Sequence, residues 1–136
     1  MGDIITVYGG AKIVSGGLAD TSKNILKTGP TAPNYYRYLS EAEVTAINET
    51  GLLRGGKPGA NYFTTDLYKN STTAQKRLSL PNTPTRRVEL EILNSPKMEL
   101  NGTKVTPANG QPGKGMEFMT NEPVKVKIIN NQPLRE

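Results

Sequence analysis

The amino-acid sequence predicts one α+β domain, with helices mostly before Pro81 and strands mostly after it. Segments before Pro81 carry helix start and stop signals, whereas the segments after it alternate apolar with polar residues. The 136 residues suffice for one hydrophobic core, and the 14 Gly and 10 Pro indicate short elements joined by loops. A helical bundle is therefore excluded.

Residues 1–33 differ from the rest of the chain. They are rich in glycine, contain only short apolar stretches and end in Gly29-Pro30-Thr31-Ala32-Pro33. We interpret them as a variable leader or linker to the folded domain, residues 34–136, with one short helix over residues 18–26. The alternative is a first hairpin that packs on the core.

The domain should begin with a strand over residues 35–39, because Tyr35-Tyr36-Arg37-Tyr38-Leu39 is rich in β-forming aromatic residues. A helix should follow directly. Ser40 can accept a hydrogen bond as its N-cap, and Glu43 can reach back to complete a capping box. Gly51 offers the left-handed conformation that ends such a helix.

A glycine-rich loop at residues 55–59 precedes the next predicted strand, residues 61–65. The loop lacks the residue spacing and the following helix of a P-loop, so that kind of phosphate site is excluded. A second helix should start after Asp66 or Asn70 and run through Leu78.

The last third of the chain predicts a sheet. Residues 87–92 alternate apolar with charged side chains, which indicates a strand with one buried face. Residues 97–105 predict a hairpin around the turn Asn101-Gly102. The remaining predictions are a loop over Pro107 to Gly115 and strands over residues 116–120 and 124–129.

The composition excludes several kinds of chemistry. With no Cys and no His, the chain has no disulfide, no thiolate nucleophile and no Ser-His-Asp triad, and it lacks the preferred ligands of transition metals. We therefore expect no metal site. The net charge of +5 favours an acidic partner, a nucleotide or a nucleic acid. No apolar run is long enough for a membrane span and no export signal is present, so we expect a soluble domain without membrane contact.

Charged and hydroxyl side chains within the predicted strands are the candidate site residues. Arg37 lies between two tyrosines, where a guanidinium can hold phosphate oxygens or simply stack on a ring at the surface. Glu117 begins a strand after the glycine-rich loop, where it can meet a ligand or face solvent. Thr64 and Thr65 can donate hydroxyls nearby, although threonine is also a common strand former.

Six segments together carry a family resemblance. They are Tyr36-Arg37-Tyr38-Leu39-Ser40, Gly51-Leu52-Leu53-Arg54-Gly55-Gly56, Tyr62-Phe63-Thr64-Thr65, Arg77-Leu78-Ser79-Leu80-Pro81, Asn101-Gly102-Thr103-Lys104-Val105 and Glu117-Phe118-Met119-Thr120. In this order they resemble the C-terminal toxin domains of bacterial polymorphic toxins, of the Rhs and contact-dependent-inhibition type. Within these, the resemblance is to an ADP-ribosyltransferase group associated with elongation factor Tu, and it covers about residues 35–134.

The resemblance implies an ADP-ribosyltransferase-like split β-sheet with a few short helices, which clasps NAD, the substrate, in its cleft. The family places an Arg on an early strand, a hydroxyl on a middle strand and a Glu on a late strand, and Arg37, Thr64 and Glu117 occur in that order. Arg37 would hold the pyrophosphate or the adjacent ribose, and Thr64 would fix the neighbouring geometry. Glu117 would hold the nicotinamide ribose and stabilise an oxocarbenium-like transition state. The residues expected to bind NAD are Arg37, Tyr38, Tyr62, Thr64 and Thr65.

The chain departs from the family pattern in two places. Tyr62-Phe63-Thr64-Thr65 stands where better-known members have Ser-Thr-Ser, which leaves open whether Thr64 or Thr65 takes the hydroxyl role. Position 115, where an Arg-modifying transferase carries a further Glu or Gln, is Gly. The acceptor residue on the target therefore stays open.

The resemblance implies an antibacterial toxin that transfers ADP-ribose from NAD to a component of the bacterial translation machinery, such as elongation factor Tu. It would be the C-terminal part of a larger secreted toxin, delivered by contact-dependent inhibition or type VI secretion into the cytoplasm of a target bacterium. A cognate immunity protein, acidic to match the basic chain, would plug the cleft. The alternatives are NAD hydrolysis without an acceptor, a metal-free ribonuclease toxin that cleaves tRNA or rRNA, and a non-catalytic module that binds an acidic partner.

Overall fold

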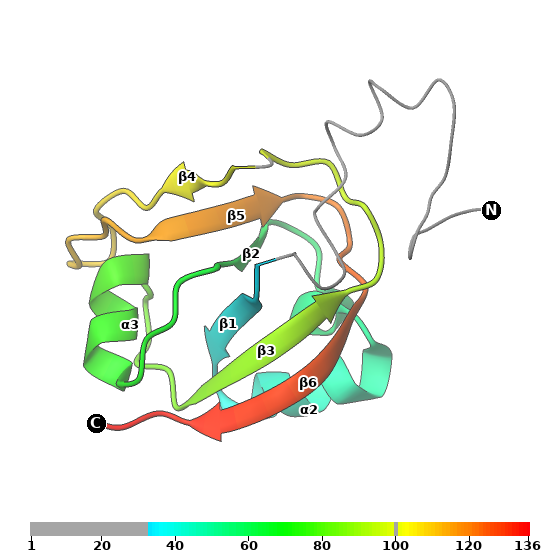
Figure 1. Ribbon diagram of the computed structural model, residues 1–136, viewed down its shortest axis with the longest axis horizontal. Coiled ribbons are helices and arrows are strands. Elements are labelled where there is room, and N and C mark those ends of the chain that lie inside the picture. The colour runs from blue at the N-terminus through cyan, green and yellow to red at the C-terminus, as the bar shows by residue number, and fades with distance from the viewer. Residues whose placement is uncertain (1–32, 100) are drawn as a thin grey trace.

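The computed structural model describes residues 33–99 and 101–136 (Figure 1). The predicted leader, its helix over residues 18–26 and the alternative hairpin lie outside these residues. The described part has two α-helices and two small antiparallel sheets, which is α+β content as predicted. In chain order the elements are β1 (Tyr35–Leu39), α2 (Glu41–Thr50), the short 3-10 helix η1 (Leu53–Gly56), β2 (Asn61–Phe63), α3 (Ser71–Leu78), β3 (Arg86–Ile92), β4 (Thr103–Lys104), β5 (Met116–Thr120) and β6 (Val126–Pro133).

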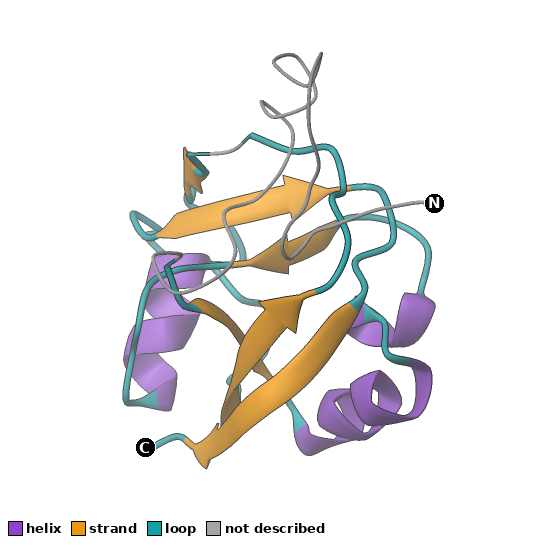
Figure 2. Cartoon of the chain, turned by 45° about the vertical axis from the view of Figure 1, so that its right-hand side comes forward, coloured by secondary structure: helices purple, strands orange, loops and turns teal. Residues whose placement is uncertain are grey.

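The two sheets have the strand orders β1-β3-β6 and β2-β5-β4. They meet at one bridge between Tyr36 on β1 and Thr64, the residue after β2. There the Tyr36 N–H donates to the Thr64 carbonyl at 2.7 Å, and the Thr64 N–H donates to the Tyr36 carbonyl at 2.9 Å. Figure 2 shows the strands of the two sheets running in different directions, with the helices to either side. The arrangement is two small antiparallel sheets that are joined at this bridge.

Helix α2 forms where the sequence predicts it. The Ser40 hydroxyl accepts from the Glu43 N–H at 3.3 Å, and Gly51, with φ 71°, ends the helix in the left-handed conformation. The second half of the predicted capping box is absent, because the Glu43 carboxylate accepts from Arg37 instead. A charged guanidinium is the stronger donor for a carboxylate than a backbone N–H, and β1 places it within reach.

Helix α3 also forms as predicted, and the structure decides its N-cap. Asn70, rather than Asp66, takes this role, since its side-chain oxygen accepts from the Thr73 N–H at 2.8 Å. The helix ends at Ser79, which adopts the left-handed conformation with φ 51°. Across residues 33–99 and 101–136, no helix is long and apolar enough to cross a membrane.

The predicted hairpin over residues 97–105 is wrong. The turn forms, with the Gly102 N–H donating to the Glu99 carbonyl at 3.2 Å, but β4 pairs with β5, which places Thr103 opposite Glu117. A Cβ atom on Gly102 would lie 2.9 Å from the Glu117 carbonyl oxygen, so glycine at this position allows the close approach. A turn is a local signal, whereas the pairing partner is set by packing.

Among residues 33–99 and 101–136, buried side chains form two clusters. We call the first the apolar core, and it joins both sheets to α2. Its buried members are Tyr35, Leu39, Val44, Ile47, Leu53, Phe63, Val88, Leu90, Ile92, Phe118, Val124 and Val126. We call the second the tyrosine cluster, and it packs beside α3. Its members are Tyr36, Tyr38 and Ala74, with the partly buried Tyr68, Leu78, Leu80 and Leu134.

Candidate functional site

A pocket of about 350 Å³ opens beside the bridge that joins the two sheets, and both bridge residues, Tyr36 and Thr64, line it. Its lining includes Arg37, Tyr38, Tyr62, Thr64 and Glu117, which the sequence analysis singled out from three separate segments of the chain. Thr65 does not line it. A further wall comes from residues 78–81, 105–106 and 108–109. The fold therefore brings the predicted arginine, one predicted hydroxyl and the late carboxylate to one pocket.

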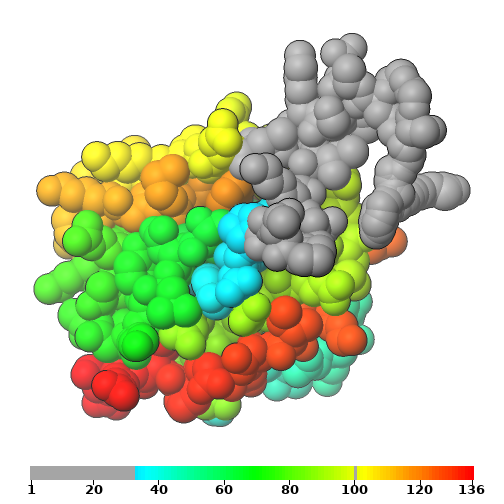
Figure 3. All heavy atoms as spheres, in the orientation of Figure 1, coloured from blue at the N-terminus to red at the C-terminus, as the bar shows by residue number. Residues whose placement is uncertain are grey.

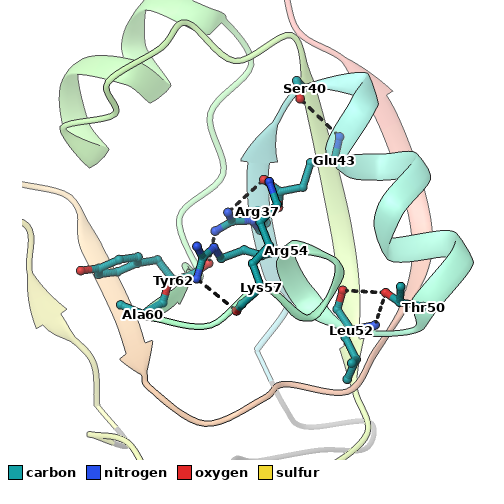
Figure 4. Close-up of polar contacts among 9 residues, drawn as sticks. All are labelled: Arg37, Ser40, Glu43, Thr50, Leu52, Arg54, Lys57, Ala60 and Tyr62. Atoms are coloured by element: carbon teal, nitrogen blue, oxygen red, sulfur yellow. Dashed lines mark hydrogen bonds and ion pairs between the residues drawn. The ribbon is translucent and has the colours of Figure 1, made fainter.

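The Arg37 guanidinium is held from two sides, as Figure 4 shows. Its Nε and Nη2 donate to the Glu43 carboxylate, with Nη2 at 3.1 Å from Oε1, and its Nη1 donates to the Tyr62 carbonyl at 2.6 Å. Each terminal nitrogen carries a second N–H, for which the described residues provide no acceptor. The guanidinium is thus oriented by Glu43 and still has donors for an anionic ligand.

A second arginine, Arg54, lies beside the same strand (Figure 4). Its Nη1 donates to the carbonyls of Ala60 at 2.9 Å and Pro58 at 3.2 Å. The carbonyls of Ala60, Tyr62 and Thr64 therefore accept from Arg54, Arg37 and the Tyr36 backbone in turn. Alternate carbonyls of a strand point the same way. The two guanidiniums therefore donate to the carbonyl groups along the edge of β2 that do not pair with β1.

Glycine-rich loop 55–59 also folds around the Arg54 guanidinium. It points carbonyl oxygens toward that cation, at Pro58 and also at Lys57 with 3.5 Å to Nη1. A phosphate cradle requires backbone N–H groups in this position. The carbonyl oxygens that face Arg54 are thus the opposite of what a P-loop presents, in agreement with the sequence analysis, which excluded a P-loop.

Thr64 is buried, with 1% of its surface exposed. Its hydroxyl donates to the Met116 carbonyl at 2.6 Å and accepts from the Asp66 N–H at 2.9 Å. The hydroxyl therefore ties the end of β2 to the residue before Glu117. Thr64 is the threonine that reaches the pocket, and its contacts suit it to positioning Glu117.

Glu117 is half-buried on β5, and burial raises the pKa of its carboxyl above the ordinary value of 4.5. Within residues 33–99 and 101–136, its carboxylate has no hydrogen-bond or ion-pair partner. It shares a strand face with Met119, which is paired with Tyr62 on β2. A partly desolvated carboxylate without a protein partner is suited to accept a hydrogen bond from a ligand hydroxyl.

Gly115 shows why no second carboxylate stands two residues before Glu117. A Cβ atom at this position would lie 2.7 Å from the Tyr68 hydroxyl and 2.9 Å from the Arg77 carbonyl oxygen. The Tyr68 hydroxyl is fixed there because it donates to Asp66 at 2.8 Å. Any side chain at position 115 would displace this network, so the pocket is built for a single carboxylate on β5.

The tyrosines of the lining differ in what they can offer. Burial raises the pKa of Tyr38 to about 12, and its hydroxyl donates to the Asp66 carbonyl at 2.7 Å and accepts from the Tyr68 N–H at 2.6 Å. Tyr38 therefore lines the pocket while its hydroxyl has protein partners. Tyr62 is 43% exposed, and its ring is available to a ligand.

The wall formed by residues 78–81, 105–106 and 108–109 was not identified from the sequence. The Ser79 hydroxyl donates to the Thr106 carbonyl at 2.8 Å, and the Asn109 side-chain amide donates to the Ser79 carbonyl at 2.8 Å. Asn109, with φ 53°, is left-handed like Ser79. Positive φ at two non-glycine residues is a detectable sign of a constrained site, but it is visible only in coordinates.

The described part of the chain contains no group of three or more acidic side chains that could hold a metal ion. The chain matches no protein-family model, no curated protein and no solved structure. The function must therefore be argued from the residues and geometry of this pocket.

Proposed function

We propose that the chain is an NAD-dependent ADP-ribosyltransferase that modifies a component of the bacterial translation machinery, with elongation factor Tu as the first candidate. One observation carries the proposal: Arg37, Thr64 and Glu117, far apart in the sequence, line one pocket. The two small antiparallel sheets, which meet at one bridge between β1 and the end of β2, support it, because the family resemblance implies a split sheet. The pocket volume of about 350 Å³ lies within the range of small-molecule sites.

The proposed reaction gives separate tasks to Arg37, Glu43 and Glu117. The second N–H groups of Arg37 hold the pyrophosphate of NAD, while Glu43 keeps the guanidinium in place. Glu117 accepts from a hydroxyl of the nicotinamide ribose, and its charge stabilises the positive charge that develops on the ribose. The glycosidic bond breaks, and nicotinamide leaves as a neutral molecule with the electron pair. A nucleophile of the target forms the new bond to the same carbon, and the proton that it loses passes to solvent.

As a toxin domain, the chain would act in the cytoplasm of a target bacterium as the C-terminal part of a larger secreted protein. Its producer would need an immunity protein, and an acidic surface over the pocket would match the net charge of +5. An immunity protein that binds far from Glu117 would contradict this geometry.

The test is incubation of the purified chain with labelled NAD and bacterial lysate. We expect one labelled protein band. The variant Glu117→Gln keeps the shape of the side chain, and its transfer should fall at least about 100-fold because the charge that stabilises the transition state is gone. Glu91→Gln on β3, an exposed position with the same change of charge, is the matched control and should retain full transfer.

Three outcomes would contradict the proposal. Full transfer by Glu117→Gln would show that Glu117 does not take part in the reaction. Release of nicotinamide without any labelled macromolecule would indicate NAD hydrolysis. Cleavage of tRNA or rRNA without consumption of NAD would indicate a ribonuclease toxin.

A further inference from the structure

Arg54 is a half-buried arginine whose guanidinium has unused hydrogen-bond donors. Its Nη1 donates to the carbonyls of Ala60 at 2.9 Å, Pro58 at 3.2 Å and Lys57 at 3.5 Å. Its Nε and Nη2 carry three further N–H groups, for which the described residues provide no acceptor. Within residues 33–99 and 101–136, Arg54 also forms no ion pair. The side chain is therefore anchored through one nitrogen and open through the other two.

The backbone at Arg54 has an uncommon conformation. Arg54 is left-handed with φ 57°, although its side chain makes this conformation less favourable than it is for glycine. The next residue, Gly55, packs directly on α2, because a Cβ atom there would lie 2.9 Å from the Ala46 Cβ. Non-glycine residues in the left-handed region are found most often at ligand sites and other functional positions. The conformation of Arg54 is therefore an independent reason to ask what its free donors bind.

Arg37 and Arg54 are anchored to the same edge of β2. The Arg37 Nη1 donates to the Tyr62 carbonyl at 2.6 Å, and the Arg54 Nη1 donates to the Ala60 carbonyl two residues earlier. Two residues of an extended strand span about 6.6 Å, which is the spacing of the two carbonyl anchors. Figure 4 shows the two side chains meeting at this edge, Arg37 from β1 and Arg54 from η1. The fold thus places two guanidiniums with free N–H groups next to each other.

Packing fixes the segments that carry the two arginines. The bridge between the sheets ties β1 to the end of β2, and in Figure 3 the cyan atoms of the β1 region lie directly beside the green atoms of later segments. The Glu43 carboxylate of α2 holds the Arg37 guanidinium. The Leu53 N–H donates to the Val124 carbonyl at 2.9 Å, which fixes the residue before Arg54. A ligand therefore meets two cations that are already in place.

The charges around the two arginines suit an anion with two acidic groups. Glu43 compensates the charge of Arg37, whereas Arg54 has no acidic partner in the described ranges, and Lys57 adds an exposed cation in the same loop. A carboxylate has both oxygens on one carbon and fits a single guanidinium. A diphosphate has two linked groups of oxygens and can accept from two neighbouring guanidiniums at once. A diphosphate is therefore the anion that uses both arginines.

We propose that Arg37 and Arg54 each bind one phosphate of a single diphosphate, so that Arg54 selects a dinucleotide over a mononucleotide. The inference rests on the proposed function for the identity of the ligand, NAD. Arg37 lines the pocket together with Glu117, so it holds the phosphate on the side of the nicotinamide ribose. Arg54 lies outside the pocket lining and holds the phosphate on the adenosine side, along the edge of β2.

The test is isothermal titration calorimetry of the full chain, without NAD or target, against two ligands. ADP-ribose carries both phosphates, whereas nicotinamide mononucleotide carries only the phosphate assigned to Arg37. Arg54→Gln should weaken the binding of ADP-ribose about tenfold, because a charged contact to one phosphate is lost, and should change that of the mononucleotide less than about twofold. Arg135→Gln removes the same charge at an exposed position outside the pocket lining. It is the matched control and should leave both affinities within about twofold of the parent chain.

A second measurement needs no variant. In the parent chain, pyrophosphate should displace ADP-ribose at a concentration about tenfold lower than citrate, which is a polycarboxylate. Equal competition by citrate would show unspecific attraction of anions and overturn the proposal. Equal losses for both ligands in Arg54→Gln would show that Arg54 only holds the loop, and would also overturn it. Binding of ADP-ribose that depends on Arg54, in a chain that transfers nothing from NAD, would support this site and contradict the transferase alone.

Discussion

The apolar core and the tyrosine cluster lie in the same small domain but are built differently. The apolar core joins both sheets to α2, and its aliphatic and aromatic side chains reach near-complete burial, as at Ile47 with 1% exposed. Phe63 and Phe118 stack there with ring centroids 5.3 Å apart. The tyrosine cluster has fewer buried members, and its hydroxyls need hydrogen-bond partners.

The difference corresponds to the position of the pocket. Four members of the tyrosine cluster line it, namely Tyr36, Tyr38, Leu78 and Leu80. From the apolar core, Phe63 reaches the pocket lining. We therefore expect the apolar core to provide most of the stability. The tyrosine cluster is smaller, and part of it forms the wall of the pocket. Changes in the two regions should separate stability from activity.

The largest effect is expected from a cavity in the apolar core. Ile47→Ala should lower the free energy of unfolding by about 3 kcal/mol, because a buried branched side chain is removed from a packed site. Urea denaturation followed by circular dichroism measures this loss. Leu93→Ala, at a position 54% exposed, is the control and should cost less than about 0.5 kcal/mol. Equal costs at both positions would contradict the assignment of the core.

An intermediate effect is expected in the tyrosine cluster. Tyr38→Phe removes one hydroxyl and leaves the Asp66 carbonyl and the Tyr68 N–H without this partner, which should cost about 1 to 2 kcal/mol. Thermal unfolding compares it with Tyr62→Phe, whose exposed ring should make the same change nearly neutral. If Tyr38→Phe is also neutral, the hydroxyl network does not hold the cluster together.

The smallest effect on stability is expected at Glu117. Burial raises the pKa of this carboxyl above its ordinary value of 4.5, so the folded state binds the proton more tightly than the unfolded state does. Stability then falls as the pH rises from the unfolded pKa through the raised folded pKa. Glu117→Gln should remove this slope, so that its stability at pH 7 equals or slightly exceeds that of the parent chain, while its transfer falls at least about 100-fold. Loss of stability in this variant would mean that Glu117 has a structural partner.

Local signals in the sequence were sufficient for most elements. β1 and β5 have the predicted bounds, and α2 is capped by Ser40 and Gly51 as expected. Thr64 and Glu117 were identified by their residue types and order, but their convergence could not be read from spacing alone. Glu43 was assigned to the helix cap, since no linear pattern connects it to a guanidinium on the preceding strand.

The sequence by itself determined the bounds of β1, α2 and β5, because caps, turns and alternation act between residues a few positions apart. Only the tertiary structure decided that β4 pairs with β5, that Arg37 and Arg54 cover the edge of β2, and that residues 78–81, 105–106 and 108–109 close the pocket. Those contacts join segments far apart in the chain. Which segments meet depends on how all the apolar faces are buried together, and that is a property of the whole fold.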